Sequence, residues 1–256
     1  MNVRIGADPE TLLKDLYGNY ISGAGLFGGT KDNPLPIGEG CAIQEDNVTI
    51  EFNIPPTNNV IDFLKYINFN LEHIENRAKE LDLLLTIEPS AIYSDEELDS
   101  FQAQTFGCEP DFNAWRKGAR NPRPKTTNKN LRSAGGHIHI EAPDLNKIEL
   151  TKAMDLFVGA QMLSFDTDKM RRKLYGKAGA FRPKDYGIEY RTPSNAWLKT
   201  DELKKWAFEQ TQKAVQFVQS GKQIDEYLGN LLQKAINQSD TNALNELNLY
   251  ANTVYA

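Results

Sequence analysis

Four short stretches of the chain carry polar or charged side chains two residues apart, in a context that favours β-strands. They are Asp8 with Glu10, Glu51 with Asn53, His137 with His139, and Glu189 with Arg191. Because a strand sends residues i and i+2 to the same face, each pair points to one place. Carboxylates and imidazoles buried without partners are costly, and a polyvalent metal ion is the simplest partner for all of them. The spacing therefore predicts a metal-dependent site on one face of a sheet.

Each pair also has a structural interpretation when it is taken alone. The first acidic pair could lie on a solvated edge, and Glu51 with Asn53 could face water on a half-buried strand. Glu189 and Arg191 could form a surface ion pair, and the two histidines could be a satisfied structural pair. A common site would require all four strands to meet.

The elements that must position these pairs can be predicted from hydrophobic periodicity and turn residues. Strands are expected at 3–10, 47–56, 133–142 and 187–192, and helices at 60–81, 147–165 and from about 200 onward. Residues 106–133 and 171–183 are expected to be loops, because they are rich in turn residues and basic groups. Pro9 cannot donate to a strand ladder, so its strand is predicted to lie at an edge or to carry a bulge.

The order of these elements favours an α+β fold with a mostly antiparallel sheet backed by helices, because regular β–α alternation is absent. The 256 residues are expected to form a single domain, with a helical C-terminal part from about residue 200. A formal net charge of −6 disfavours nucleic acid as a partner. Two cysteines give no disulfide framework, and no apolar run is long enough for a membrane span. We therefore expect a cytoplasmic protein.

A glycine-rich stretch at Gly23–Gly28, GAGLFG, fits the spacing of a dinucleotide-binding loop. The residues that follow, GTKDNPLP, cannot open the helix that would hold a pyrophosphate. A Walker loop would need Lys directly after Gly and then Ser or Thr, whereas here Thr30 separates Gly29 from Lys31. We reject both interpretations, and a glycine turn that brings Lys31 near a site entrance stays open.

Seven blocks between about Arg4 and Trp197 stand out, in the order GADPE, GGTKDNP, QEDNVTIEFNIPP, FGCEPDF, LRSAGGHIHI, RRKLYGKAGAFR and GIEYRTPSNAW. This series resembles the phage-encoded type 2 carboxylate-amine ligases, a branch of the glutamine synthetase-like superfamily. The resemblance implies an antiparallel sheet that forms a funnel, with ATP entering one end and Mg²⁺ held between acidic strands. It does not supply the substrate.

The resemblance also implies roles for individual residues. The implied metal ligands are Asp8, Glu10, Glu51, His137 and Glu189, with Glu45 or Asp46 as an upstream partner of Glu51. His139 is expected near the nucleotide or substrate. Arg191 and Arg182 are expected on phosphate, with Lys177 as a further cation. Mg²⁺ is the expected ion, and Mn²⁺ is the alternative because it tolerates a histidine ligand better.

The implied reaction is ATP-dependent amide formation, in which a carboxylate attacks the γ-phosphate and an amine then displaces phosphate from the acyl phosphate. Asp111 or Glu109 in the long loop is the candidate base for the amine. Expected partners are ATP and unidentified carboxylate and amine substrates, with a peptide or protein as one option; an oligomer stays open. The competing interpretations are a metal-dependent hydrolase or phosphoesterase, and a catalytically silent phage scaffold protein.

Overall fold

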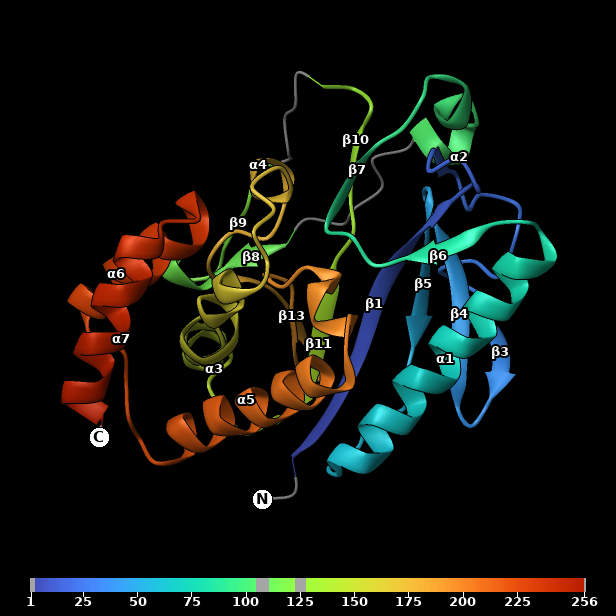
Figure 1. Cartoon of the computed structure of the whole chain (residues 1–256). Helices are drawn as coiled ribbons and strands as arrows, with labels where there is room; N and C mark the ends of the chain where they lie inside the picture. Colours follow the sequence, from blue (N-terminus) through green and yellow to red (C-terminus); the bar gives the residue numbers. More distant parts are fainter. Residues whose placement is uncertain (1–2, 105–110, 123–127, 256) are drawn as a thin grey trace.

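The computed structural model describes residues 3–104, 111–122 and 128–255 (Figure 1). Thirteen strands are seen in these residues: β1 (Arg4–Lys14), β2 (Tyr20–Ile21), β3 (Leu35–Gly38), β4 (Cys41–Asp46), β5 (Thr49–Asn53), β6 (Leu84–Thr86), β7 (Ser90–Ile92), β8 (Phe112–Asn113), β9 (Ala119–Arg120), β10 (Leu131–Ser133), β11 (Gly136–Glu141), β12 (Ala180–Lys184) and β13 (Gly187–Tyr190). The α-helices are α1 (Val60–Glu80), α2 (Phe101–Gln104), α3 (Lys147–Met154), α4 (Arg171–Leu174), α5 (Asp201–Gln219), α6 (Glu226–Gln238) and α7 (Thr241–Tyr255).

The main sheet has the strand order β3-β4-β5-β1-β11-β13-β12-β8-β9, and β2 and β6 also pair with β1. Strands β7 and β10 form a separate two-stranded sheet, and every pairing among the described residues is antiparallel. The predicted α+β fold with a mostly antiparallel sheet backed by helices is confirmed.

The two faces of the central strands differ in polarity, as their alternating sequences require. The apolar face contributes Ile50, Phe52, Ile138, Ile140 and Ile188 to the main hydrophobic core. Helix α5 packs against both α1 and α3 (Figure 1). Helix α1 contacts β1, β4 and β6, and α3 contacts β12 and β13. The polar pairs are therefore left on the opposite face.

Helix α1 shows how the sequence specifies this packing. The Asn59 side chain caps its first turn by accepting a hydrogen bond from the Ile61 amide at 2.8 Å. Its buried positions include Phe63, Ile67 and Ile74, which recur at helical spacing. The predicted helix at 60–81 is confirmed to within one residue at its end.

Strand β1 lies inside the sheet, between β5 and β11, so the expected edge position for Pro9 is wrong. Pro9 is paired with Gly136 of β11. On the other side, β5 pairs with Glu10 and Thr11, and the Ile54 amide donates to the Ala7 carbonyl. The recorded β1–β5 register begins directly after Pro9, at Glu10, so the proline lies at the end of that ladder.

Two segments predicted to be loops contain strands. Residues 106–133 include the short strands β8, β9 and β10, and residues 171–183 include α4 and most of β12. Strand β12 pairs with β13 through a hairpin, and glycines and basic residues before it concealed its short apolar–polar alternation. The helix predicted at 147–165 begins as α3 and continues as a π-helical turn at Asp155–Gly159 and a 3-10 turn at Gln161–Ser164.

After residue 200 the chain forms α5, α6 and α7, as its periodicity predicts. A single domain for residues 1–256 stays a prediction. Among the described residues, none of the helices combines the length and the apolar character that crossing a membrane requires.

Candidate active site

The registers of four strand pairs bring the predicted site residues onto one face of the sheet. Asp8 is opposite His137, Glu10 is opposite Glu51, and Glu189 is opposite both His139 and Arg182. Directly opposed residues in antiparallel strands point to the same side. Because β1, β11 and β13 are neighbours in the sheet, these registers bring the first acidic pair, Glu51, both histidines and Glu189 to one site. Arg191 follows directly after β13.

Glu10, Asp46 and Glu51 form the first group, here called the three-acid cluster. One carboxylate oxygen of each lies within 4.8 Å of the others. The Gly135 amide donates to Glu10 Oε2 at 2.6 Å, and Gln44 Nε2 donates to Glu51 Oε1 at 2.9 Å. Burial is the main cause, and the charge of Asp46 the second, that raise the pKa of Glu10 to about 7. Burial and the neighbouring acids raise the pKa of Glu51 well above its usual range. Three acids held this way suit a cation.

The structure separates Glu45 from Asp46, the two candidates for the upstream acid. Adjacent residues on a strand face opposite ways, and Asp46 lies in the three-acid cluster. Glu45 instead accepts hydrogen bonds from the amides of Gly25, Phe27 and Gly28 at 2.6, 2.8 and 2.7 Å. These amides lower the pKa of Glu45 in spite of its partial burial. The geometry therefore favours Asp46 for the cluster.

Asp8, His139 and Glu189 form the second group, here called the histidine cluster, again with ligand atoms within 4.8 Å of one another. His139 Nε2 is 3.0 Å from Asp8 Oδ2, and its Nδ1 is hydrogen-bonded to the Tyr186 hydroxyl. The Asp8 charge raises the pKa of His139 against the effect of burial. The structure thus groups His139 with these two carboxylates, and the role of His137 as a metal ligand stays a prediction.

His137 lies between the histidine cluster and Arg191. Its Nδ1 is 3.5 Å from Asp8 Oδ1, 4.0 Å from Glu189 Oε1 and 3.3 Å from Arg191 Nη1. Burial and the Arg191 charge lower the pKa of His137 to about 4. A neutral imidazole is the form that coordinates metal, so His137 keeps a ligand's protonation state at neutral pH.

Glu189 is surrounded by cations. Arg191 Nη1 donates to Glu189 Oε1 in a short hydrogen bond, Arg182 Nη1 lies 3.2 Å from the same oxygen, and Lys184 Nζ lies 3.0 Å from Oε2. Burial by itself raises the pKa of Glu189, but the neighbouring positive charges, Arg191 first, lower this pKa to about 2. This end of the site therefore carries excess positive charge around one carboxylate.

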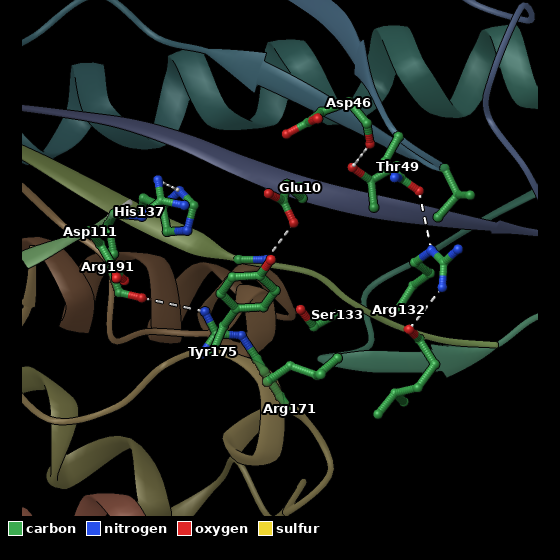
Figure 2. Close-up of a pocket in the computed structure, with 15 residues that line it drawn as sticks. Glu10, Asp46, Thr49, Asp111, Arg132, Ser133, His137, Arg171, Tyr175 and Arg191 are labelled. Atoms are coloured by element: carbon green, nitrogen blue, oxygen red, sulfur yellow. Dashed lines mark hydrogen bonds between the residues drawn. The ribbon is translucent and has the colours of Figure 1, made fainter. Parts of the chain in front are cut away.

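A cavity opens on this face beside the three-acid cluster (Figure 2). Its lining includes Glu10, Asp46, Asp111, His137 and Arg191. Figure 2 shows Arg171 and Tyr175, from the segment around α4, across the cavity from Glu10. Val48, Leu131 and Leu174 add an apolar part to the wall. The cavity thus joins an acidic group, an arginine and an apolar surface.

The remaining predicted site residues are Asp111, Glu109 and Lys177. Asp111 lies in the cavity lining with Arg191, whereas Glu109 lies outside the described residues. Lys177 is half-buried and is not among the residues that line the cavity; burial and Arg172 lower its pKa.

Sequence reasoning missed Arg171 and Tyr186. Arg171 is 2% exposed and donates to the carbonyls of Ala134, Thr192 and Arg191 at 3.1, 2.8 and 3.4 Å. It thereby ties the start of β11 to the segment after β13. A Cβ at Gly176 would collide with Arg171 Nη1, so this glycine leaves room for the buried guanidinium.

The donor sets fit divalent metal ions. The three-acid cluster offers only carboxylate oxygens, which Mg²⁺ prefers. In the histidine cluster, Asp8 Oδ1 is buried and makes no hydrogen bond within the described part of the chain. A buried carboxylate oxygen without a donor is costly unless a cation contacts it. Both groups therefore have the charge and the open acceptor capacity that metal binding requires.

The solved structure titled "Apo GmaS without ligand" aligns with 96% of this chain and 65% of that chain, at 11% sequence identity and a TM-score of 0.47. This chain thus spans somewhat less than two-thirds of that structure's length. No curated protein matches the sequence. Residues 128–253, which contain β11, β12 and β13 with both histidines, Glu189 and Arg191, match the sequence model of the family described as phage phiEco32-like COOH.NH2 ligase-type 2. The similarity to this family thus covers the C-terminal half of the chain.

Proposed function

We propose that the protein is an ATP- and Mg²⁺-dependent ligase that joins a carboxylate to an amine. The observation that carries this proposal is the placement of two potential metal sites and a set of arginines on one face beside a cavity. Phosphoryl transfer depends on positioning and on neutralising charge, which metal ions and arginines supply together. The match of residues 128–253 to the model of a COOH.NH2 ligase family supports the same reaction class.

The two clusters are the proposed metal sites. Glu10, Asp46 and Glu51 would hold one ion and Asp8, His139 and Glu189 another, with His137 available beside the second. Bound Mg²⁺ would offset phosphate charge and orient the phosphates of ATP.

The first step activates the carboxylate. A substrate carboxylate oxygen attacks the γ-phosphorus of ATP, the bond from that phosphorus to the β,γ-bridging oxygen breaks, and ADP leaves with an acyl phosphate formed. Arg191, which lines the cavity, would contact the transferring group from one side. Arg182 is held 3.2 Å from Glu189 and would contribute positive charge next to it. A guanidinium fork suits this task because it meets phosphate oxygens in pairs.

In the second step an amine attacks the acyl carbon, phosphate leaves, and the amine nitrogen loses a proton. Asp111 is the proposed proton acceptor, because its carboxylate belongs to the same cavity lining as Arg191. Asp111→Asn is expected to lower the rate of amide formation by on the order of a hundredfold, the scale of general-base catalysis. Equilibrium binding of Mg·ATP should change little, since the base acts only after the acyl phosphate exists. An equal loss of ATP affinity would remove Asp111 from the base role.

The function itself is tested by hydroxamate formation. Hydroxylamine replaces the unknown amine, and pools of amino acids, short peptides and other carboxylic acids replace the unknown carboxylate. We expect hydroxamate to form only with both Mg²⁺ and ATP. Phosphate release from phosphorylated compounds without ATP would instead favour a metal-dependent phosphoesterase, and inactivity with every pool together with no binding of Mg·ATP would favour a silent scaffold.

A further inference from the structure

Asp155 is a buried carboxylate that neither of the proposed reaction steps uses. It begins the π-helical turn that follows α3, and its exposed fraction is 0%. Its Oδ1 accepts a hydrogen bond from the Tyr190 hydroxyl at 2.7 Å, and its Oδ2 accepts one from Trp115 Nε1 at 2.6 Å. Burial raises the pKa of Asp155 to about 6, although these donors act to lower it. Burying a carboxylate costs more than burying an apolar side chain, so packing alone does not account for this residue.

The contact with Tyr190 lies next to Arg191. Strand β13 ends at Tyr190, so Arg191 lies one residue past the last pair of the β11–β13 ladder. Neighbouring residues of an extended chain point to opposite sides. The Tyr190 side chain accordingly enters the hydrophobic core, whereas Arg191 lines the cavity. Asp155 therefore anchors the end of this strand from the core side, at the point where the ladder stops.

A local change in the helix makes this contact possible. Between Asp155 and Gly159 the helix widens into a π turn, in which the Ala160 amide donates to the Asp155 carbonyl at 2.8 Å. A Cβ at Gly159 would collide with the Tyr190 hydroxyl, so the glycine lets the helix approach the strand. Single π turns are rare and frequently lie at functional sites.

The contact with Trp115 anchors the segment that carries Asp111. Trp115 lies in the turn directly after β8, and Asp111 directly precedes that strand. Cβ atoms at Gly179 and at Gly229 of α6 would each lie 2.6 Å from the indole ring, so the ring is held closely between these two backbones. The indole N–H is thereby fixed toward the buried carboxylate, and the start of β8 is fixed with it.

We infer that Asp155 is a positioning residue that fixes Arg191 and Asp111 relative to each other at the cavity. This inference rests on the proposed function, in which Arg191 serves the first step and Asp111 the second. Each oxygen of one carboxylate holds the segment that carries one of these residues. Aspartate suits this task because it accepts hydrogen bonds on both oxygens, whereas asparagine of the same size has a single acceptor oxygen.

Substitutions can remove each contact separately. Tyr190→Phe removes the donor on the strand side, Trp115→Phe removes the donor on the loop side, and Asp155→Asn disturbs both. Tyr250→Phe is the matched control, because the Tyr250 hydroxyl also donates to an aspartate, Asp225, at 2.9 Å within the C-terminal helices.

The two reaction steps are followed separately in a single turnover. Excess enzyme is mixed with Mg·ATP, hydroxylamine and the carboxylate found in the hydroxamate screen, and ADP and hydroxamate are measured over time. The time course of ADP reports the first step, and any delay of hydroxamate behind ADP reports the second. Unfolding midpoints are measured for every variant, and the reactions are run below the lowest of them.

We expect Tyr190→Phe to slow ADP formation about tenfold, with hydroxamate following without added delay. A misplacement of about 1 Å can cost roughly a hundredfold, and a phenylalanine that keeps the ring in place should cost less. Trp115→Phe should change ADP formation less than about twofold and slow the later appearance of hydroxamate about tenfold. Asp155→Asn should slow both steps, and Tyr250→Phe should slow neither.

Unchanged rates of both steps in Tyr190→Phe and Trp115→Phe would overturn the inference. Equal slowing of both steps in these two variants would also overturn it, because a general loss of stability would have that effect. The two variants decide the matter even if Asp155→Asn does not fold. Failure of the unmodified protein to form ADP would instead contradict the proposed function, on which the inference rests.

Discussion

Replacing Glu51 by glutamine is expected to abolish turnover while making the metal-free protein more stable. Glu51 is 8% exposed and shares its site with two other carboxylates. Loss of a residue that hydrogen-bonds to a metal ligand costs roughly 10- to 100-fold in metal affinity or activity. Loss of a proposed ligand itself should therefore cost more. Glutamine keeps the size of the side chain and an oxygen that can accept the hydrogen bond from Gln44, but it removes a buried negative charge.

The sign of the stability effect follows from proton binding. The pKa values of Glu51 and Glu10 are raised in the folded protein, by burial first and then by their acidic neighbours. The folded state therefore holds protons that the unfolded state has already released above the ordinary carboxyl range. Stability without metal should fall as the pH rises from about 4.5 toward the Glu10 value of about 7. Glu51→Gln should reduce this fall and raise the free energy of unfolding at pH 8 by on the order of 1 kcal/mol or more.

The measurement is urea unfolding in EDTA at pH 5 and pH 8, repeated with Mg²⁺. Glu45→Gln is the matched comparison, because the pKa of Glu45 is lowered by three amide donors and its charge stabilises the fold. We expect that variant to lose stability at pH 8, opposite in sign to Glu51→Gln. A less stable Glu51→Gln protein in EDTA, or one that still gains stability from Mg²⁺ as the unmodified protein does, would contradict the three-acid cluster as a metal site.

Arg191→Lys is expected to lose on the order of a hundredfold in turnover with its fold intact, the scale of removing one donor from a developing charge. Lysine keeps the positive charge beside Glu189, and Arg182 and Lys184 still pair with that carboxylate, so stability should change little. Lysine cannot reproduce the planar fork that meets two oxygens at once.

Arg77→Lys is the control, since Arg77 is an exposed arginine paired with Glu80 on α1. Turnover and unfolding midpoint are measured for both variants. Activity of Arg191→Lys at the level of the unmodified protein would show that Arg191 serves the structure alone.

Much of the site could be predicted because strand alternation and strand pairing decide it. The i, i+2 spacing placed each polar pair on one face, and the registers then joined Asp8 to His137 and Glu10 to Glu51. Helix α1 followed from its own periodicity and cap. The strand alternation and the helix depend on local sequence, which a single chain displays directly, whereas the registers are seen only in the structure.

The rest depended on contacts that sequence spacing does not contain. Glu45 and Asp46 are adjacent acids, and only the packing of the glycine turn on β4 shows that Glu45 is occupied. The grouping of His139 with Glu189 follows from the β11–β13 register, which no local pattern gives. Arg171 was concealed in a basic stretch typical of solvated loops, although its charge is buried against three carbonyls.

The central claim is that a carboxylate is activated by transfer of the γ-phosphoryl group. It is tested most directly by supplying the carboxylate found in the hydroxamate screen with ¹⁸O in its carboxyl group, together with Mg·ATP and hydroxylamine, and analysing the products by mass spectrometry. The proposed mechanism predicts ADP and phosphate in equal amounts, with one ¹⁸O transferred from the carboxylate to each phosphate. Formation of AMP and pyrophosphate, or of phosphate without ¹⁸O, would contradict it.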